Sequence, residues 1–400
     1  MKVPLPRLLD GSVLQLYPPA VPRDFCAPQW FCAHLEPLKE LLAAYAGVGA
    51  GVICAPTGGA DPLSLEAKGL FDQMEAFNRS LMEAAVEAAG KTGLAAGVLE
   101  STGLGHWEEI PFGRRVDSYA QQALCLKEAG AVLLVIRKMT WLPEARAAVL
   151  GARQTELPIL VAMEPCDSRL PMEEEAVLAA LVVLQELGVE GFGLEGNAPP
   201  AVMEPILQRL EGLAKVPLIA KPAAAYSDEM GRATLLSPGA FAAMAQGLIQ
   251  SGAVLLGGGV GSTPEHIRAL SSPSAGAAGS HDRQPAPLVL AGEKGVYYLD
   301  EDFTFSQPLT CHLDMSEAVL EAEDCGCDAL LVRVSTAADG IMLGENGYLF
   351  RMPICLLADS AEALESALFH TTGRLMVDRR SDLPGEELDR IAAGYGALVR

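Results

Sequence analysis

The chain has 400 residues, half of them hydrophobic, and a formal net charge of −22 at pH 7. This acidity opposes binding to nucleic acid or to an anionic membrane, because phosphate contacts need clustered Lys and Arg. The length is enough for one large domain of about 250 residues and a second, smaller domain.

The N-terminus and the cysteines indicate a cellular location. The chain starts with MKVPLPRLLDG, which lacks the apolar segment of a secretory signal. No apolar stretch approaches the roughly 18 residues that a membrane span needs. Nine cysteines are spread thinly over the chain, an odd number that favours reduced thiols. We therefore expect a cytoplasmic protein with no membrane partner and no nucleic-acid partner.

Residues 5–270 alternate short apolar runs with longer amphipathic segments. The predicted strands lie at 7–11, 50–56, 93–100, 131–138, 158–165, 191–196, 217–222 and 253–259. Helical segments follow them, as at 173–188, where EEEAVLAALVVLQELG has apolar residues at helical spacing and a final glycine. Eight β/α units predict a closed (β/α)8 TIM barrel over residues 1–270. A doubly wound open sheet is the alternative.

The rest of the chain reads as a linker and a small α/β domain. Residues 271–287, SSPSAGAAGSHDRQPAP, have nothing to bury and predict the linker. Residues 288–400 contain the predicted strands PLVLAG (which starts at 287), GVYYLD, DALLVRV, PICLLAD and RLMVDR, with helical patterns at 315–326 and 360–373. Cys325 and Cys327 form a Cys-x-Cys pair, and they are either metal ligands or small buried side chains at a helix end.

Ligands of a TIM barrel bind at the carboxyl ends of its strands. The residues expected there are Asp10, Cys54, Glu100, Arg137, Lys138, Glu164, Glu195, Lys221 and the glycines 257–259. Charges of both signs around one mouth are costly unless they pair or meet a polar ligand. The sequence thus predicts a polar pocket for a small-molecule substrate, and the alternative is that these side chains pair structurally or face solvent.

Specific roles follow from residue type. Lys221 is the candidate Schiff-base or general-base residue, with Glu164 or Glu195 as its acid partner. This role predicts a lysine pKa well below its solution value, whereas the structural alternative is a salt bridge to Glu195 or Glu164. The residues assigned to substrate binding are Asp10, Gly11, Glu100, Arg137, Lys138, Gly257 and Gly258.

The run GGGVGSTPEHI at 257–267 lies where the last barrel strand turns into a helix. Glycine lets a ligand approach the main chain closely, so the run predicts the floor of a binding site. Thr263 is the expected helix cap and Pro264 the first helical residue. His266, on the first turn, is expected to be structural.

This run, together with LLDGSVLQL near the N-terminus, resembles the homocysteine S-methyltransferase family, whose pattern is Gly-Gly-Cys-Cys-Gly-Thr-Thr-Pro-Glu-His-Ile. Asp10-Gly11 matches the family's first-strand Asp-Gly. The resemblance implies a TIM barrel that transfers a methyl group to a thiol in one-carbon and methionine metabolism. It also implies a zinc ion on three cysteine thiolates, which lowers the pKa of the bound thiol.

The implied zinc ligands are replaced in this sequence. Gly196, Gly259 and Val260 stand at the three cysteine positions, and Glu195 stands at the family's Asn. Side chains of glycine and valine do not coordinate metals, so no metal and no cofactor are predicted. An alternative metal site would combine Glu195 with two cysteines near strand ends, Cys54 and Cys166.

Two further departures affect the mouth. The family's Glu-Thr after the fourth strand reads Arg137-Lys138, and its Thr-Asn-Thr-Phe after the second strand reads APTG at 55–58. The resemblance therefore predicts a rebuilt site. The segments CGCDALLVRV and LLADSAEALESAL are similar to parts of a pterin-binding barrel, which implies a truncated half barrel in the C-terminal domain.

Three functions stay open at this point. The resemblance implies methyl transfer to a thiol, although the zinc ligands are missing. The residues suggest a metal-independent small-molecule enzyme that uses Lys221 and acidic partners. The third alternative is a non-catalytic subunit that partners a methyltransferase or a corrinoid protein through residues 287–400.

Overall fold

The computed structural model describes residues 5–18, 20–21, 25–104, 110–165, 174–227, 232–271, 288–299 and 302–400. The chain divides into two compact units, Met1–Met172 with Val189–His281 and Glu173–Gly188 with Asp282–Arg400. The predicted linker 271–287 lies almost wholly outside the described residues, so the domain boundaries stay a prediction. Within the described ranges, no helix has the length and apolar character needed to cross a membrane.

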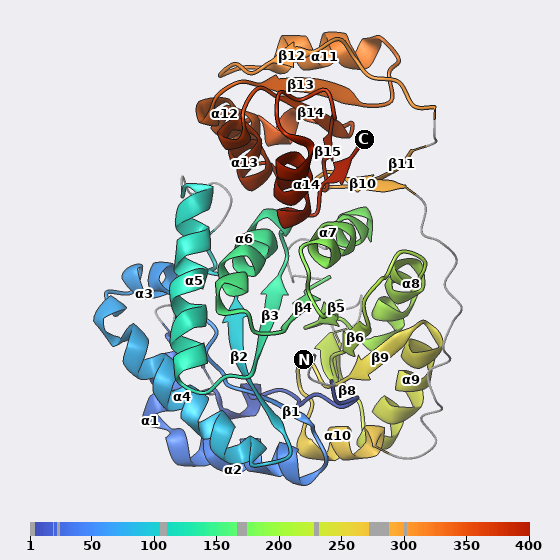
Figure 1. The fold of residues 1–400 in the computed structure, drawn as a ribbon. Coiled ribbons are helices and arrows are strands. Elements are labelled where there is room, and N and C mark those ends of the chain that lie inside the picture. The colour runs from blue at the N-terminus through green and yellow to red at the C-terminus, as the bar shows by residue number, and fades with distance from the viewer. Residues whose placement is uncertain are drawn as a thin grey trace. The chain divides into compact units, whose positions relative to one another are not determined.

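The first unit is built on a parallel sheet with strands in chain order (Figure 1). Its strands are β1 Val52–Cys54, β2 Leu94–Glu100, β3 Leu133–Met139, β4 Ile159–Met163, β5 Gly191–Glu195, β6 Leu218–Lys221 and β9 Ala253–Leu256. The segment around Leu8 and Leu9 lies between the two edges, because Leu8 pairs with Leu256 and Leu9 with Val52. The Leu9 N–H donates to Leu256 O at 2.8 Å. The sheet thus closes as the predicted TIM barrel, and the doubly wound alternative is wrong.

The barrel interior is apolar along most of its depth. A cluster of buried side chains comes from the Leu9 segment and from every strand of the sheet except β5: Leu9, Val52, Cys54, Ala96, Val98, Leu133, Val135, Leu160, Ile219 and Leu255. Successive inward-facing residues are two apart in each strand. The next inward positions after Val98, Val135 and Ile219 are therefore Glu100, Arg137 and Lys221, and charges form the last layer of the barrel.

Helices surround this sheet (Figure 1). They are α1 Ala27–Ala33, α2 Leu35–Gly47, α3 Pro62–Glu66, α4 Met74–Ala89, α5 Phe112–Glu128, α6 Leu142–Ala152, α8 Pro200–Glu211, α9 Pro238–Gln250 and α10 Pro264–Leu270, with 3-10 turns η1 Leu14–Leu16, η2 Phe71–Gln73 and η3 Arg153–Thr155. Helix α10 begins at Pro264, as predicted. His266 is structural, because its Nδ1 accepts from the Thr263 N–H at 3.2 Å and its Nε2 lies 2.9 Å from Leu236 O.

One element of the first unit is absent from the sequence prediction. A short antiparallel hairpin, β7 Ala225–Ser227 and β8 Ala233–Leu235, lies between β6 and α9. Both of its strands are only three residues long and largely exposed. They carry too little apolar alternation to be recognised as strands.

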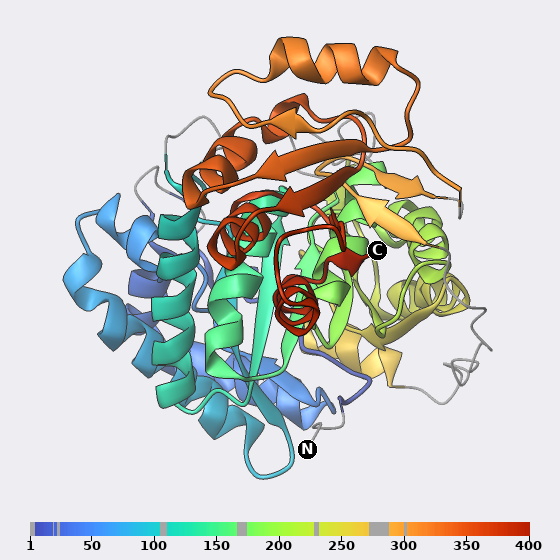
Figure 2. The same ribbon diagram turned by 45° about the horizontal axis from the view of Figure 1, so that its top comes forward.

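The second unit contains a parallel five-stranded sheet, also in chain order. Its elements are α7 Glu174–Glu186, the antiparallel pair β10 Val289–Ala291 and β11 Val296–Tyr298, then β12 Leu309–Thr310, α11 Ser316–Asp324, β13 Leu330–Val334, α12 Ala337–Glu345, η4 Gly347–Leu349, β14 Ile354–Ala358, α13 Ala361–His370, β15 Met376–Val377, α14 Gly385–Gly394 and β16 Leu398–Val399. In Figure 2 the strands β13 and β14 run side by side in orange and red. Parallel strands in sequential order also occur in TIM barrels, so this order is compatible with the half barrel, which stays a prediction.

Both faces of the second sheet are covered. Val332 and Leu356 belong to the cluster that includes Leu364 of α13, whereas Leu331 and Cys355 pack with Leu290 of the β10–β11 pair on the other face. The cysteines of the Cys-x-Cys pair lie just after α11. Cys327 is half-buried but Cys325 is exposed, so the expectation that both are buried is wrong for Cys325.

Candidate functional site

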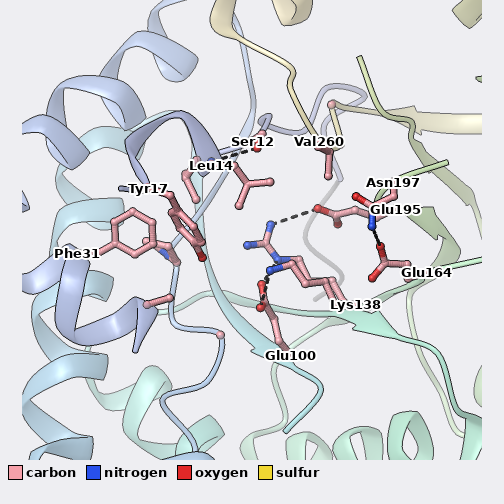
Figure 3. Close-up of a pocket in the computed structure, with 18 residues that line it drawn as sticks. Ser12, Leu14, Tyr17, Phe31, Glu100, Lys138, Glu164, Glu195, Asn197 and Val260 are labelled. Carbon is pink, nitrogen blue, oxygen red and sulfur yellow. Dashed lines mark hydrogen bonds and ion pairs between the residues drawn. The ribbon is translucent and has the colours of Figure 1, made fainter. Parts of the chain in front are cut away.

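The first unit contains a pocket of about 190 Å³ at the carboxyl ends of the barrel strands. Its lining residues are Ser12, Val13, Leu14, Tyr17, Ala27, Phe31, Pro56, Gly58, Glu100, Arg137, Lys138, Glu164, Glu195, Gly196, Asn197, Gly258, Gly259 and Val260. Figure 3 shows Leu14, Tyr17 and Phe31 on one side of it and Glu195, Asn197 and Glu164 on the other. We call it the mouth pocket.

The predicted site residues separate into two layers. Those that line the mouth pocket are Glu100, Arg137, Lys138, Glu164, Glu195 and Gly258. Those that do not are Asp10, Gly11, Lys221 and Gly257. Asp10 is 1% exposed and Lys221 2% exposed, so these two charges lie in the barrel interior, away from the pocket surface.

The buried charges pair in an alternating row, which we call the ion-pair chain. Its members in order are Asp10, Lys221, Glu195, Arg137, Glu100 and Lys138. Lys221 Nζ lies 3.3 Å from Asp10 Oδ1 and 3.1 Å from Glu195 Oε1. Asp10 Oδ2 in turn accepts the Cys54 N–H at 2.7 Å. The inner half of the ion-pair chain thus links the segment around Leu9 to β1, β5 and β6.

The outer half of the ion-pair chain reaches the mouth pocket. Arg137 Nη1 donates to Glu195 Oε1 at 3.2 Å, and its Nε donates to Glu100 Oε1 at 2.8 Å. Lys138 Nζ donates to Glu100 Oε2 at 2.9 Å. Three cations alternate with three carboxylates, so each buried charge has an opposite neighbour, as a low-dielectric interior requires.

A bulge in β3 explains how two adjacent residues reach one carboxylate. Neighbouring side chains of a regular strand point to opposite faces. The pairing of β3 with β4 shifts register between Arg137 and Met139, and Lys138 has a φ of 54°. This left-handed conformation is unfavourable for lysine and marks a locally constrained backbone. It brings Lys138 to the same side as Arg137, onto Glu100.

Lys221 does not have the pKa that a Schiff-base or general-base role predicts. Burial disfavours its ammonium form, but the carboxylates of Glu195 and Asp10 outweigh burial and hold the pKa of Lys221 above its ordinary value. The predicted lowered pKa is therefore wrong. The structural alternative is right about Glu195, with Asp10 as a second partner that the sequence did not single out for this pairing.

Glu100 is held as a carboxylate. Burial opposes its charge, yet Lys138 and Arg137 together lower its pKa to about 2. The same carboxyl group occupies the space beside Gly58, where a Cβ would overlap it. A residue with a side chain at the end of the APTG segment would therefore collide with Glu100 of the ion-pair chain.

Glu195 and Glu164 form an acidic side of the mouth pocket. Glu195 is 6% exposed, and its Oε2 is buried without a hydrogen-bond partner among the described residues. Asn197 Nδ2 donates to Glu164 Oε1 at 2.9 Å (Figure 3). A Cβ on Gly196 would lie 2.5 Å from that same Glu164 oxygen. Glycine at position 196 therefore makes room for the Glu164 carboxylate.

The glycines of the run allow other groups of the protein to pack closely at the end of the barrel. A Cβ on Gly257 would lie 2.8 Å from Asp10 O and 2.9 Å from Lys221 Cγ. On Gly258 it would collide with Ser262, whose Oγ donates to Gly259 O at 2.8 Å. Only Gly258 and Gly259 of the three line the pocket. The predicted floor is thus present, but the close approaches are made by the protein's own groups.

Several lining residues were missed by sequence reasoning. Tyr17 and Phe31 come from the loop and helix after the first strand, and Asn197 follows β5. The rule that βα loops form the mouth of a TIM barrel would have selected these loops. It would not have selected the individual side chains, because irregular segments have no periodicity.

The zinc ion that the resemblance implies does not fit these residues. A Cβ on Gly259 would lie 2.5 Å from Lys221 O and 2.6 Å from Gly196 O, both backbone atoms. Of the nearby carboxylates, Glu195 accepts from Lys221 and Arg137 through Oε1, and Glu164 Oε1 accepts from Asn197. In the part of the chain that the structure describes, no three His, Cys, Asp or Glu side chains are grouped to hold a metal. Cys166, one alternative ligand, lies outside the described residues.

Comparisons with known proteins agree on one family. A family model described as homocysteine S-methyltransferase matches residues 8–273. The methionine synthase of Mycobacterium leprae is 29% identical over 165 residues, which are 39% of this chain and 14% of that protein. The methionine synthase of Mycobacterium tuberculosis is 31% identical over 167 residues, with the same coverage. The matches therefore span a small part of these relatives.

Solved structures show the same fold. The homocysteine methyltransferase MmuM of Escherichia coli, in its metallated form, has a TM-score of 0.53 and 22% identity. The match covers 66% of this chain and 94% of that one. Its oxidised form has a TM-score of 0.51 and 23% identity. With the family model matching well over half of the residues, the chain belongs to the homocysteine S-methyltransferase family.

Proposed function

We propose that this chain acts at the mouth pocket on a small substrate of one-carbon and methionine metabolism, by methyl transfer to a thiol that does not use zinc. Family membership supports the reaction class. One observation supports the metal-independent part of the proposal. The ion-pair chain fills the barrel beneath the mouth pocket, and the glycines beside it leave no room for cysteine side chains.

The size of the mouth pocket limits what it holds. Its volume of about 190 Å³ is below the roughly 300–1,000 Å³ of pockets that enclose drug-sized ligands. This suits one small amino acid such as homocysteine, and a bulky methyl donor would have to approach from outside. Leu14, Tyr17 and Phe31 supply an apolar side that excludes water from the reacting groups.

We assign the proton transfer and the positioning of charged groups to individual residues. Methyl transfer to a thiol forms a carbon–sulfur bond, breaks the bond to the donor, and releases the thiol proton. Glu164 and Glu195 are the carboxylates available in the pocket to accept a proton or a hydrogen bond. Lys221 keeps its own proton, so we assign it the positioning of Glu195. Glu100 holds Arg137 and Lys138 in place.

The test uses the full chain purified without chelator. We expect elemental analysis to find no stoichiometric zinc, and calorimetry to show saturable binding of L-homocysteine. Methyl transfer to homocysteine from a sulfonium donor should persist in chelator. One zinc per chain, or activity abolished by chelator, would overturn the proposal.

A variant pair ties binding to the site. Glu195→Gln removes a pocket charge, and we expect it to weaken homocysteine binding about tenfold. Glu128→Gln makes the same change at the exposed end of α5, and should leave binding unchanged. If no homocysteine binds and a stable complex with a methyltransferase or corrinoid protein forms instead, the subunit alternative replaces this proposal.

A further inference from the structure

We propose that the mouth pocket recognises the two opposite charges of a small amino acid and does not read its sulfur. The inference rests on the proposed function only for the identity of the working site. It extends that function because it predicts ligands without any sulfur atom. Two sides of the pocket with unsatisfied hydrogen-bonding groups of opposite kind carry the argument.

The first side offers donors for a carboxylate. Arg137 uses Nε and Nη1 in the ion-pair chain, and its Nη2 hydrogen-bonds to none of the described residues. Lys138 bonds Glu100 through one of its three N–H groups, and its side chain is 41% exposed. The bulge holds both cations on the pocket side of β3. A guanidinium N–H and an ammonium side by side suit a carboxylate.

The second side offers an acceptor for an ammonium group. Glu195 Oε1 accepts from Lys221 and Arg137, but its Oε2 is buried and unpartnered among the described residues. The Glu195 side chain is 8% exposed, so this oxygen carries an uncompensated desolvation cost. Glu164 adds a second carboxylate beside Gly196. An N–H donor of positive charge would satisfy Glu195 Oε2.

Nothing in the pocket selects sulfur. The described lining residues include no Cys, His or Met, and Cys54 lies beneath the pocket at 4% exposure. Burial raises the pKa of the Cys54 thiol above its ordinary value. The apolar residues that a ligand side chain could meet are Val13, Leu14, Tyr17, Ala27, Phe31, Pro56 and Val260. Contact with these groups favours burial of any apolar side chain, so a methyl group and a thiol should bind with similar affinity.

A ligand series tests this on the full chain by calorimetry. L-Norvaline carries a methyl group in place of the thiol of L-homocysteine and keeps both charges, and we expect its Kd to lie within about threefold of that of homocysteine. 4-Mercaptobutyrate lacks the ammonium and 3-mercaptopropylamine lacks the carboxylate. Each should bind at least about tenfold more weakly, because each loses a charge-assisted hydrogen bond.

A matched pair of variants assigns the carboxylate to its partner. Lys138→Asn removes the cation but tolerates the left-handed backbone. It should weaken the binding of L-norvaline about tenfold and leave the binding of 3-mercaptopropylamine unchanged. Lys91→Asn makes the same change just before β2, at the opposite end of the barrel, and should alter neither.

The outcomes separate this inference from the proposed function. Homocysteine binding without L-norvaline binding would overturn the inference and leave the proposed function standing. Equal losses of both ligands in Lys138→Asn would also overturn it. Failure of every ligand in the series to bind would overturn both.

Discussion

Arg137 and Arg333 occupy matching positions in two parallel sheets, yet their surroundings differ. Arg137 follows Leu133 and Val135 on the inner face of β3, and Arg333 follows Leu331 on one face of β13. The Arg137 side chain is 10% exposed between Glu100 and Glu195. The Arg333 side chain is 51% exposed, and its partner is Asp359 at 3.3 Å.

The difference shows what closing a sheet does to a charge. In a barrel the strand ends converge, so an inward arginine meets side chains from strands on several sides and loses water. In a five-stranded open sheet the same position stays at an edge of the core. Charges at the barrel mouth are thus buried and demand partners, whereas the arginine of the second unit remains largely solvated.

Arg137→Met should cause the largest loss of stability. It leaves Glu100 and Glu195 buried with less compensation, and removing one partner of a buried pair costs about 3–5 kcal/mol. Urea unfolding followed through the transition of the first unit measures the change. A loss below about 1 kcal/mol would show that the ion-pair chain relaxes into water and is not a buried unit.

Acid should weaken the barrel mouth through Glu100. Its pKa is lowered from 4.5 to about 2, so it binds protons more weakly in the folded state than in the unfolded state. Its contribution is therefore complete above the unfolded pKa and is lost as pH falls from about 5 towards 2. The shift corresponds to about 3 kcal/mol.

Glu100→Gln checks this assignment. Urea midpoints measured between pH 6 and pH 3 should fall less steeply in the variant than in the natural chain. Equal slopes would mean that other carboxylates cause the acid sensitivity, and that Glu100 is not the anchor of Arg137 and Lys138.

Gly259→Ala should destabilise by an intermediate amount. Its Cβ would approach two backbone oxygens at 2.5 and 2.6 Å, which do not move aside as a side chain would. Overpacking of this kind costs about 1–3 kcal/mol. Gly239→Ala is the matched control, because a Cβ there meets nothing within 4 Å in α9 and should stabilise slightly. Equal effects would contradict the steric account of the glycine run.

Periodicity in the sequence was sufficient to predict the barrel and most of its inner charged layer. Glu100, Glu195 and Lys221 each end an apolar strand, and Arg137 lies two residues before the end of β3. The two-residue repeat places all four on one face. How deep Lys221 lies was not predictable, because that depends on Asp10, 211 positions earlier in the chain.

Local backbone geometry was a second feature that could not be predicted from the sequence. A regular strand would turn Lys138 away from Glu100, and the bulge that reverses this has no signature in RKM. The role of Gly257 likewise depends on contacts with Asp10 and Lys221 from other strands. Patterns along the chain predict which residues share a face, whereas partners across the fold decide which of them reach the pocket.

Arg333→Met should have the smallest effect and completes the comparison with Arg137→Met. Its ion pair with Asp359 is 51% and 33% exposed, so water screens it and the loss should stay below about 1 kcal/mol. Asp359 also accepts from Ser335 Oγ, which keeps that carboxylate partnered in the variant. A double-mutant cycle with Asp359→Asn, read by urea unfolding, isolates the coupling. If this coupling energy were as large as the stability lost in Arg137→Met, enclosure by a closed sheet would not explain why removing Arg137 costs so much stability.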